Sequence, residues 1–213
     1  MQRRNALKNI GLSVGGFTMS ATVVGLMQGC KAEVASSTWQ PKFFSLDESD
    51  IVSKTLEVIL PSSDEIPGAI ELNLTQFIDG YIHEVVTEKE RNGFKAGVEE
   101  YLATTLEVAG KNKSKDLSAA DIEERLAFYL KADSKKQNAW DAEVRSALRE
   151  NGATPSRDAV NFSVLKSLRQ RGISAFKGSE FIGENVLAYD PIPGMQIGCV
   201  DLQETTQGKA WSL

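Results

Sequence analysis

The chain has one histidine, His83, and the residues around it are where the sequence could support acid–base chemistry. Asp79 lies four residues earlier, so the two side chains would share one face of a helix and could exchange a proton. The sequence places no serine, cysteine or second histidine to complete a nucleophilic site with them. A lone histidine on a helix is more often a surface or half-buried structural residue. We therefore assign no catalytic residue.

Motifs for metals and cofactors are equally sparse. One histidine and two cysteines, Cys30 and Cys199, are too few for a closed zinc site or a four-cysteine iron–sulfur site. The sequence contains no Cys-x-x-Cys-His for a c-type haem, no Glu-x-x-His for a di-iron site and no Gly-x-Gly-x-x-Gly for a dinucleotide. The pairs Glu99-Glu100 and Glu123-Glu124 fit ordinary solvated helix positions. We predict no metal-binding and no cofactor-binding residue in this chain.

The N-terminus has the pattern of an export signal. A basic pair is followed by an uncharged stretch, Ile10 to Met27, and by a small residue before Cys30. The start resembles the twin-arginine consensus Ser-Arg-Arg-x-Phe-Leu-Lys, and the matching residues are Arg3, Arg4, Leu7 and Lys8. This predicts a signal peptide over residues 1–29 that exports an already folded protein. A general secretory signal and an uncleaved N-terminal anchor remain open as alternatives.

Cys30 lies in a segment that resembles a lipobox, Leu26-Met27-Gln28-Gly29-Cys30, although Met27 replaces the usual leucine. In such a motif the chain is cut before the cysteine, which is then acylated. We predict acylation of Cys30 and thus a membrane-anchored lipoprotein in the periplasm. The alternative is a soluble periplasmic chain, in which a Cys30–Cys199 disulfide bond is possible. If Cys30 is acylated, Cys199 is either buried and inert or paired with another chain.

Length and charge limit the class of protein. The first 29 of the 213 residues contain three basic and no acidic side chains, which leaves 21 basic against 29 acidic side chains afterwards. This acidic balance argues against nucleic acid as a partner and against electrostatic binding to anionic lipid. The remaining chain, about 184 residues, is long enough for one domain whose core needs no disulfide bonds.

Apolar residues recur at helical spacing through most of the chain, and no sustained alternating run predicts a strand. We expect a tether over residues 30–44 and a helical domain over residues 45–187. The expected helices cover residues 45–60, 74–86, 87–109, 118–131, 134–150 and 158–171. This pattern predicts an all-α fold, a single domain of about six helices.

Local motifs add detail to these helices. Capping boxes are expected at Ser45–Glu48 and Thr87–Glu90, and Ser118 starts another helix. The basic segment Gly110–Lys115 reads as a solvated turn. One helix is expected to have a single apolar face, made of Phe77, Ile78, Tyr81, Ile82 and Val85.

Two segments lack a helical period. Leu60–Ala69 holds two prolines and a glycine and is expected to be a rigid polar loop. From Gly172 onward the chain becomes rich in glycine, proline and aromatic residues, and residues 188–213 are expected to form an irregular tail. Because this tail keeps large apolar side chains, it either packs over its own helices or lies on another protein.

Short motifs in both halves resemble the gluconate 2-dehydrogenase subunit 3 family. The first set is Ile59-Leu60-Pro61, Ile66-Pro67-Gly68-Ala69 and Phe77-Ile78-Asp79. The second set is Phe176–Gly183, Val186–Tyr189 and Ile192-Pro193-Gly194. A twin-arginine signal before a small helical domain is also the layout of that family. The resemblance covers residues 44–199.

The resemblance implies a small accessory subunit without a redox centre, rather than an enzyme in its own right. In that family the small subunit accompanies a large FAD-dependent dehydrogenase of the glucose–methanol–choline type, often with a c-type cytochrome. The large subunit has no export signal, so the small one would carry it out of the cytoplasm. The lipobox departs from this pattern, because anchoring is often left to the cytochrome. The alternative is a stand-alone periplasmic helical lipoprotein that acts as a binding or envelope-structure module.

If the chain binds such a partner, the two irregular segments are the expected contact surface, with aromatic side chains as anchors. The predicted interface residues are Pro61, Pro67, Gly68, Tyr189, Pro193, Gly194 and Trp211.

Overall fold

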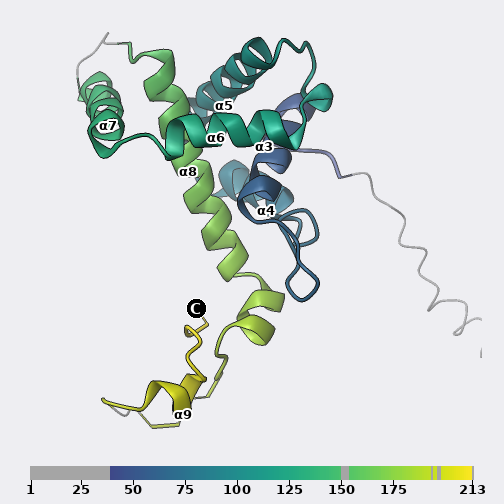
Figure 1. Ribbon diagram of the computed structural model, residues 1–213, viewed down its shortest axis with the longest axis vertical. Helices are drawn as coiled ribbons and strands as arrows, with labels where there is room; N and C mark the ends of the chain where they lie inside the picture. Colours follow the sequence, from purple (N-terminus) through teal and green to yellow (C-terminus); the bar gives the residue numbers. More distant parts are fainter. Residues whose placement is uncertain (1–38, 150–153, 193, 196–197, 213) are drawn as a thin grey trace, which may run out of the picture. The chain divides into compact units, whose positions relative to one another are not determined.

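The computed structural model describes residues 39–149, 154–192, 194–195 and 198–212. Residues from Gln40 onward belong to one compact unit. Its longer helices are α3 (Leu46–Ile59), α4 (Leu74–Glu84), α5 (Glu88–Ala109), α6 (Ala119–Leu130), α7 (Ser134–Arg149) and α8 (Arg157–Lys177), as Figure 1 shows. The described residues contain no strand, so the predicted all-α fold of about six helices is confirmed.

Short-range capping sets the helix starts as the sequence predicts, with one exception. Ser45 and Ser118 each form a complete capping box with the residue three positions later. At the start of α5, the Thr87 side chain accepts a hydrogen bond from the backbone of Glu90. The Glu90 carboxylate accepts a hydrogen bond from the Thr87 hydroxyl at 2.8 Å, not from the Thr87 backbone amide. This predicted capping box is therefore only half formed.

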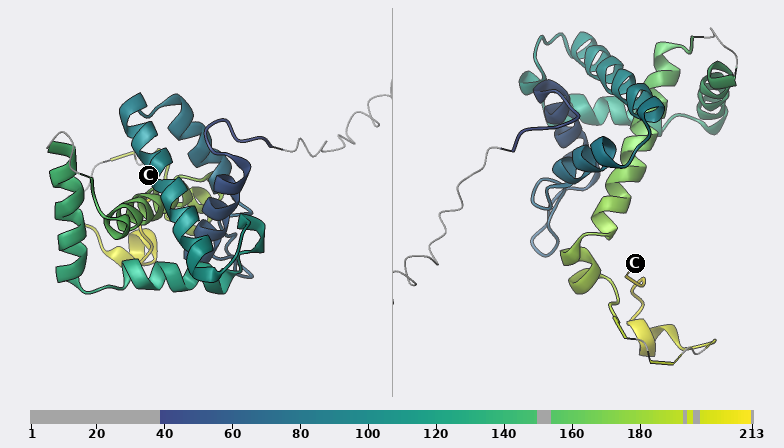
Figure 2. Two further views of the ribbon diagram at one scale, coloured as in Figure 1. Left: turned by 90° about the horizontal axis from the view of Figure 1, so that it is seen from above. Right: turned by 180° about the vertical axis from the view of Figure 1, so that it is seen from behind.

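Helix α8 is the centre of the unit and contacts α3, α4, α5, α6 and α7. Figure 2 shows α3 to α7 arranged around it. Helix α3 packs closely on α8 at Gly172, which has no side chain. A Cβ atom added there would lie 2.6 Å from a Leu56 methyl group. The predicted end at Arg171 was wrong. The helix continues to Lys177, since Ala175 and Phe176 still pack on the buried cluster.

The segment after α5 is also less exposed than the sequence predicts. Gly110 ends the helix with φ of +63°, and a short 3₁₀ turn, η1 (Ser114–Asp116), follows. Ser114 is buried and its hydroxyl donates to Asp47 at 2.6 Å. Lys54 donates to the Ser114 carbonyl at 2.7 Å. The predicted solvated turn is therefore partly packed on α3.

Helix α4 does not have the single buried face that its sequence predicts. Ile78 and Ile82 are fully buried against the core. Phe77, Tyr81 and Val85 lie on the adjacent face and remain exposed. The difference arises because the neighbouring helices cover only one side of α4, and helical spacing alone does not reveal how wide that cover is. Among the described residues no helix combines the length and the apolar character needed to cross a membrane.

Candidate partner-binding surface

The structure assigns the pair Asp79 and His83 to different environments. Asp79 is 1% exposed, and its carboxylate accepts the backbone amides of Lys42, Phe43 and Phe44 at 2.8, 3.0 and 2.9 Å. His83 is exposed, and its ring nitrogen Nε2 lies 3.8 Å from the Glu84 carboxylate. The Asp79 oxygens are thus occupied by backbone donors, which gives this residue a structural role in holding the chain that precedes α3.

We call residues 42–45 the N-terminal arm. Besides Asp79, it is held by Lys95 of α5, which donates to the Phe43 carbonyl at 3.2 Å and pairs with Glu48. Glu48 is buried and also accepts the Ser45 amide at 2.6 Å. Buried carboxylates with such partners fix the surrounding backbone firmly. The arm, where the predicted tether meets the helical domain, is therefore attached to α3, α4 and α5 at several points.

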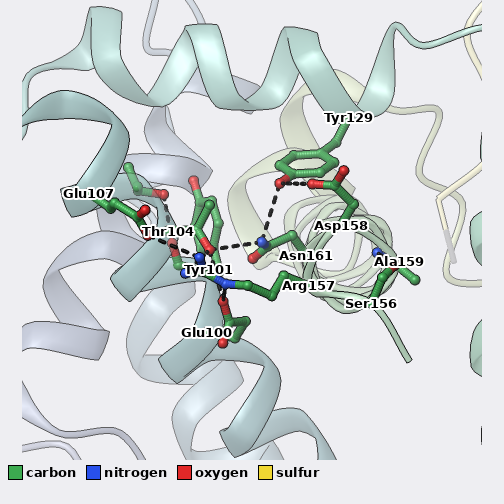
Figure 3. A network of polar contacts seen from close by, with 11 residues as sticks. Glu100, Tyr101, Thr104, Glu107, Tyr129, Ser156, Arg157, Asp158, Ala159 and Asn161 are labelled. Carbon is green, nitrogen blue, oxygen red and sulfur yellow. Dashed lines mark hydrogen bonds and ion pairs between the residues drawn. The ribbon is translucent and has the colours of Figure 1, made fainter. Parts of the chain in front are cut away.

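A polar network joins α5 to the start of α8 (Figure 3). The Arg157 guanidinium donates to Glu100 at 2.5 Å, to Glu107 at 3.0 Å and to Thr104 at 3.2 Å. The hydrogen bond from Arg157 holds the pKa of Glu100 below its usual range, and these carboxylates raise the pKa of Arg157. Glu100 is therefore not the ordinary solvated residue that the sequence predicts. No local motif reveals this, because its partner is 57 residues away.

The same network continues into the interior through Asn161. Its amide donates to Thr104 at 3.0 Å and to the Tyr129 hydroxyl at 3.2 Å, and Tyr129 donates to Asp158 at 3.0 Å. Burial, with the neighbouring Asp158, raises the pKa of Tyr129 to about 12. These contacts connect α5, α6 and α8, so the network has a structural role. Nowhere in the described part of the chain do three or more His, Cys, Asp or Glu side chains gather closely enough to hold a metal ion.

The proline-rich loop between α3 and α4 closes on itself. The Ala69 amide donates to the Leu60 carbonyl at 2.9 Å. Gly68 is buried, and a side chain there would lie 2.4 Å from the Ser62 amide nitrogen, so only glycine fits. Pro61 is exposed and Pro67 is half-buried. Of the predicted interface residues in this loop, the two prolines are accessible to a partner. Gly68 is buried and instead allows the backbone of the loop to pack closely.

The C-terminal tail folds back on itself and forms a closed loop. The Ala188 amide donates to the Ala210 carbonyl, and the Ser212 amide donates to the Ala188 carbonyl, both at 2.8 Å. These bonds form an isolated parallel bridge between Ala188 and Trp211. Between them lies a short helix, α9 (Leu202–Thr206), capped by Asp201. The sequence predicts no helix here, because one turn is too short to show a helical period.

The apolar side chains of the tail lie at its surface. Tyr189 and Trp211 are about half exposed, at 51% and 52%. The other large exposed side chains are Ile192, Met195, Val200 and Leu202. Ahead of the tail a π-helical turn, η2 (Ile182–Val186), follows α8. Among the described residues the buried cluster and its partly buried neighbours end at Phe176, so the tail does not close that core.

Several predicted sites lie outside the described residues: Arg3, Arg4, Leu7, Lys8, Cys30 and Pro193. Gly194 is described and has φ of +66°, a conformation that favours glycine. Cys199 is exposed, so the alternative in which it is buried and inert was wrong.

A small all-α domain that leaves large apolar side chains on its surface is typical of a chain that binds another protein. The family model for gluconate 2-dehydrogenase subunit 3 matches residues 46–194, which include all of both sets of motifs. The chain belongs to this family and is an accessory subunit of a multi-subunit dehydrogenase. Neither a curated protein nor a solved structure matches it.

Proposed function

We propose that this chain is the non-catalytic small subunit of a periplasmic FAD-dependent sugar or sugar-acid dehydrogenase. It carries the folded FAD subunit through the twin-arginine pathway and then anchors the complex through acylated Cys30. A c-type cytochrome completes the complex, and FAD belongs to the large subunit. The observation that carries this proposal is the family match over residues 46–194, in a chain whose N-terminus contains Arg3 and Arg4.

The N-terminal arm supports an escort role. In an escort role, the export signal and the domain that holds the partner belong to one chain and move together. The arm is held to α4 by Asp79 and to α5 by Lys95, so the segment that leads to the predicted signal joins the folded domain at a fixed point. The loop at Pro61 and Pro67 and the tail at Tyr189 and Trp211 then serve as contact surfaces for the FAD subunit.

The first prediction concerns export. Replacing both Arg3 and Arg4 with lysine keeps the positive charge of the signal and removes the arginine pair. We expect dehydrogenase activity, measured in separated cell fractions, to remain in the cytoplasm together with the FAD subunit. Immunoblotting of both subunits in the same fractions checks that neither is degraded.

A matched control separates escort from ordinary secretion. Replacing residues 1–29 with a general secretory signal should export this chain alone and leave the FAD subunit behind, because that route transports unfolded chains. Periplasmic dehydrogenase activity in both variants would contradict the escort role.

A further inference from the structure

Helix α4 carries a second apolar stripe that the core does not use. Phe77, Tyr81 and Val85 are 58%, 43% and 63% exposed. They recur every four residues and so lie on one face, and the rings of Phe77 and Tyr81 stack with centroids 6.3 Å apart. Two stacked aromatic rings kept in solvent are uncommon on the surface of a chain that acts alone.

This stripe borders a groove between α4 and the C-terminal half of α8. The groove has a volume of about 410 Å³ and is open to solvent. Its main lining residues are Leu72, Phe77, Ile78, Tyr81, Arg171 and Ala175. We call it the α4–α8 groove. It can take a few side chains of another molecule, and its walls are mostly apolar.

Among the described residues that line the α4–α8 groove, Arg171 carries the charge. Its guanidinium lies 5.8 Å from the ring centroid of Tyr81 and 5.5 Å from that of Phe94, which orients it by cation–π contacts. No carboxylate of the described residues lies within 4 Å of it, whereas Lys166, on the same helix, pairs with Asp141 at 2.6 Å. The Arg171 side chain donates a hydrogen bond to the Ser167 hydroxyl at 3.4 Å.

An arginine in this position constrains what can cover it. A partner that seals the groove removes water from the guanidinium, and this costs free energy unless the partner supplies an anion. A carboxylate meets the need best, because it accepts two parallel hydrogen bonds from the guanidinium. The neighbouring aromatic rings favour apolar side chains beside that carboxylate.

We propose that the α4–α8 groove binds a segment of the FAD subunit in which an acidic side chain is flanked by apolar ones. The carboxylate pairs with Arg171, and the apolar side chains pack on Phe77 and Tyr81. The identity of the partner rests on the proposed function. The C-terminal tail of this chain is closed into a loop by the backbone bonds of Ala188 with Ala210 and Ser212, and none of its described residues lines the groove.

The test uses the full chain in its complex. The chain is immunoprecipitated from detergent-solubilised cells, the FAD subunit is identified by flavin absorbance and mass spectrometry, and the affinity of the purified subunits is measured. We expect Arg171→Gln to weaken binding about thirtyfold or more, as for the loss of one member of a buried charge pair. Phe77→Ala should also weaken it. The wild-type affinity should fall with added salt, and that of Arg171→Gln should depend on salt less.

Matched controls test whether binding weakens simply because the chain loses a positive charge or an exposed aromatic ring. Arg169→Gln removes the same charge from an exposed position of α8 that does not line the groove. Phe128→Ala removes a comparably exposed ring from α6. Both should bind as the wild type does. Circular dichroism must show unchanged helix content in each variant, and Phe77→Ala, a surface change, keeps the test valid if Arg171→Gln folds poorly.

The outcomes separate the two proposals. If the wild-type chain does not bind a flavoprotein at all, the proposed function is overturned. If it binds and both groove variants bind equally well, the groove is overturned while the function stands. A dimer of the isolated chain that Phe77→Ala dissociates would assign the groove to a second copy of this chain and would also overturn the inference.

Discussion

At the scale of single residues, Asp79 shows how the fold redirects a group that looks chemical in the sequence. A carboxylate four residues before a histidine suggests proton transfer. In the fold, its two oxygens accept three backbone amides of the N-terminal arm instead. The donors come from 35 to 37 residues earlier, so no local pattern could reveal them.

This assignment makes a prediction about stability. Asp79→Ala should lower the free energy of unfolding by about 2–4 kcal/mol, because it leaves amides without an acceptor beside the core. Asp79→Asn should cost less, since Oδ1 still accepts from Phe43 and Phe44. Urea unfolding measures both values. Glu84→Ala, an exposed change on the same segment, is the control and should have little effect. Equal stability of all three variants would contradict the assignment.

Tyr101 predicts a dependence on alkaline pH. It is 1% exposed, its hydroxyl lies 3.0 Å from that of Thr55, and burial raises its pKa to about 12. A raised pKa means that the folded state retains the proton more strongly than the unfolded state, whose value is 10.0. The stabilisation is complete below about pH 10 and is lost as pH rises towards about 12.

Tyr101→Phe tests this dependence. At neutral pH we expect a loss of about 0.5–1.5 kcal/mol from the missing hydrogen bond. Between about pH 10 and 12 the free energy of unfolding of the variant should fall less steeply than that of the wild type. Urea unfolding at each pH measures this. Tyr129, which behaves similarly, should account for part of the slope that remains. Tyr189→Phe, a change at an exposed position, is the control. If the stability of Tyr101→Phe fell with pH as steeply as that of the wild type, this would contradict the role of Tyr101.

At the scale of elements, the C-terminal tail contributes no described residue to the buried cluster of the helices. It closes through its own backbone bonds, and its large side chains remain exposed. Since the buried cluster ends at Phe176, the helices should not need the tail in order to fold. The exposed side chains then remain available for a partner.

Truncation after Gly194 tests this separation. The shortened chain should keep its helical circular-dichroism signal and still melt cooperatively, because the core is intact. It should lose co-purification with the FAD subunit, because Trp211 is absent and the loop cannot close. Trp211→Ala in the full chain distinguishes loss of the ring from loss of the segment. Loss of helix content on truncation would instead assign the tail to the core and the interface elsewhere.

At the scale of the whole molecule, the proposed lipid anchor at Cys30 has a direct test. Cys30→Ser should release the chain, and dehydrogenase activity with it, from membranes into the soluble periplasm. The reason is that each buried acyl CH₂ group contributes about 0.8 kcal/mol to membrane binding. Cys199→Ser is the matched control and should leave the complex in the membrane fraction. Membrane attachment that persists in Cys30→Ser would show that another subunit provides the anchor.

What the sequence determined by itself was local. Caps at Ser45 and Ser118, the stop at Pro61 and helical spacing are set by residues a few positions apart, so the order and starts of the helices could be predicted. The family could be predicted for a similar reason, because its motifs are short runs of residues that keep their order along the chain.

Only the tertiary structure decided which of these residues are covered. Phe77 and Ile78 are neighbours on one apolar helix, yet one is exposed and the other buried, according to where α8 passes. Arg157 finds Glu100, whereas Arg171 lies over two rings without a carboxylate among the described residues. Such differences depend on contacts between segments far apart in the chain. Helical periodicity does not show which distant segment packs against a given helix face.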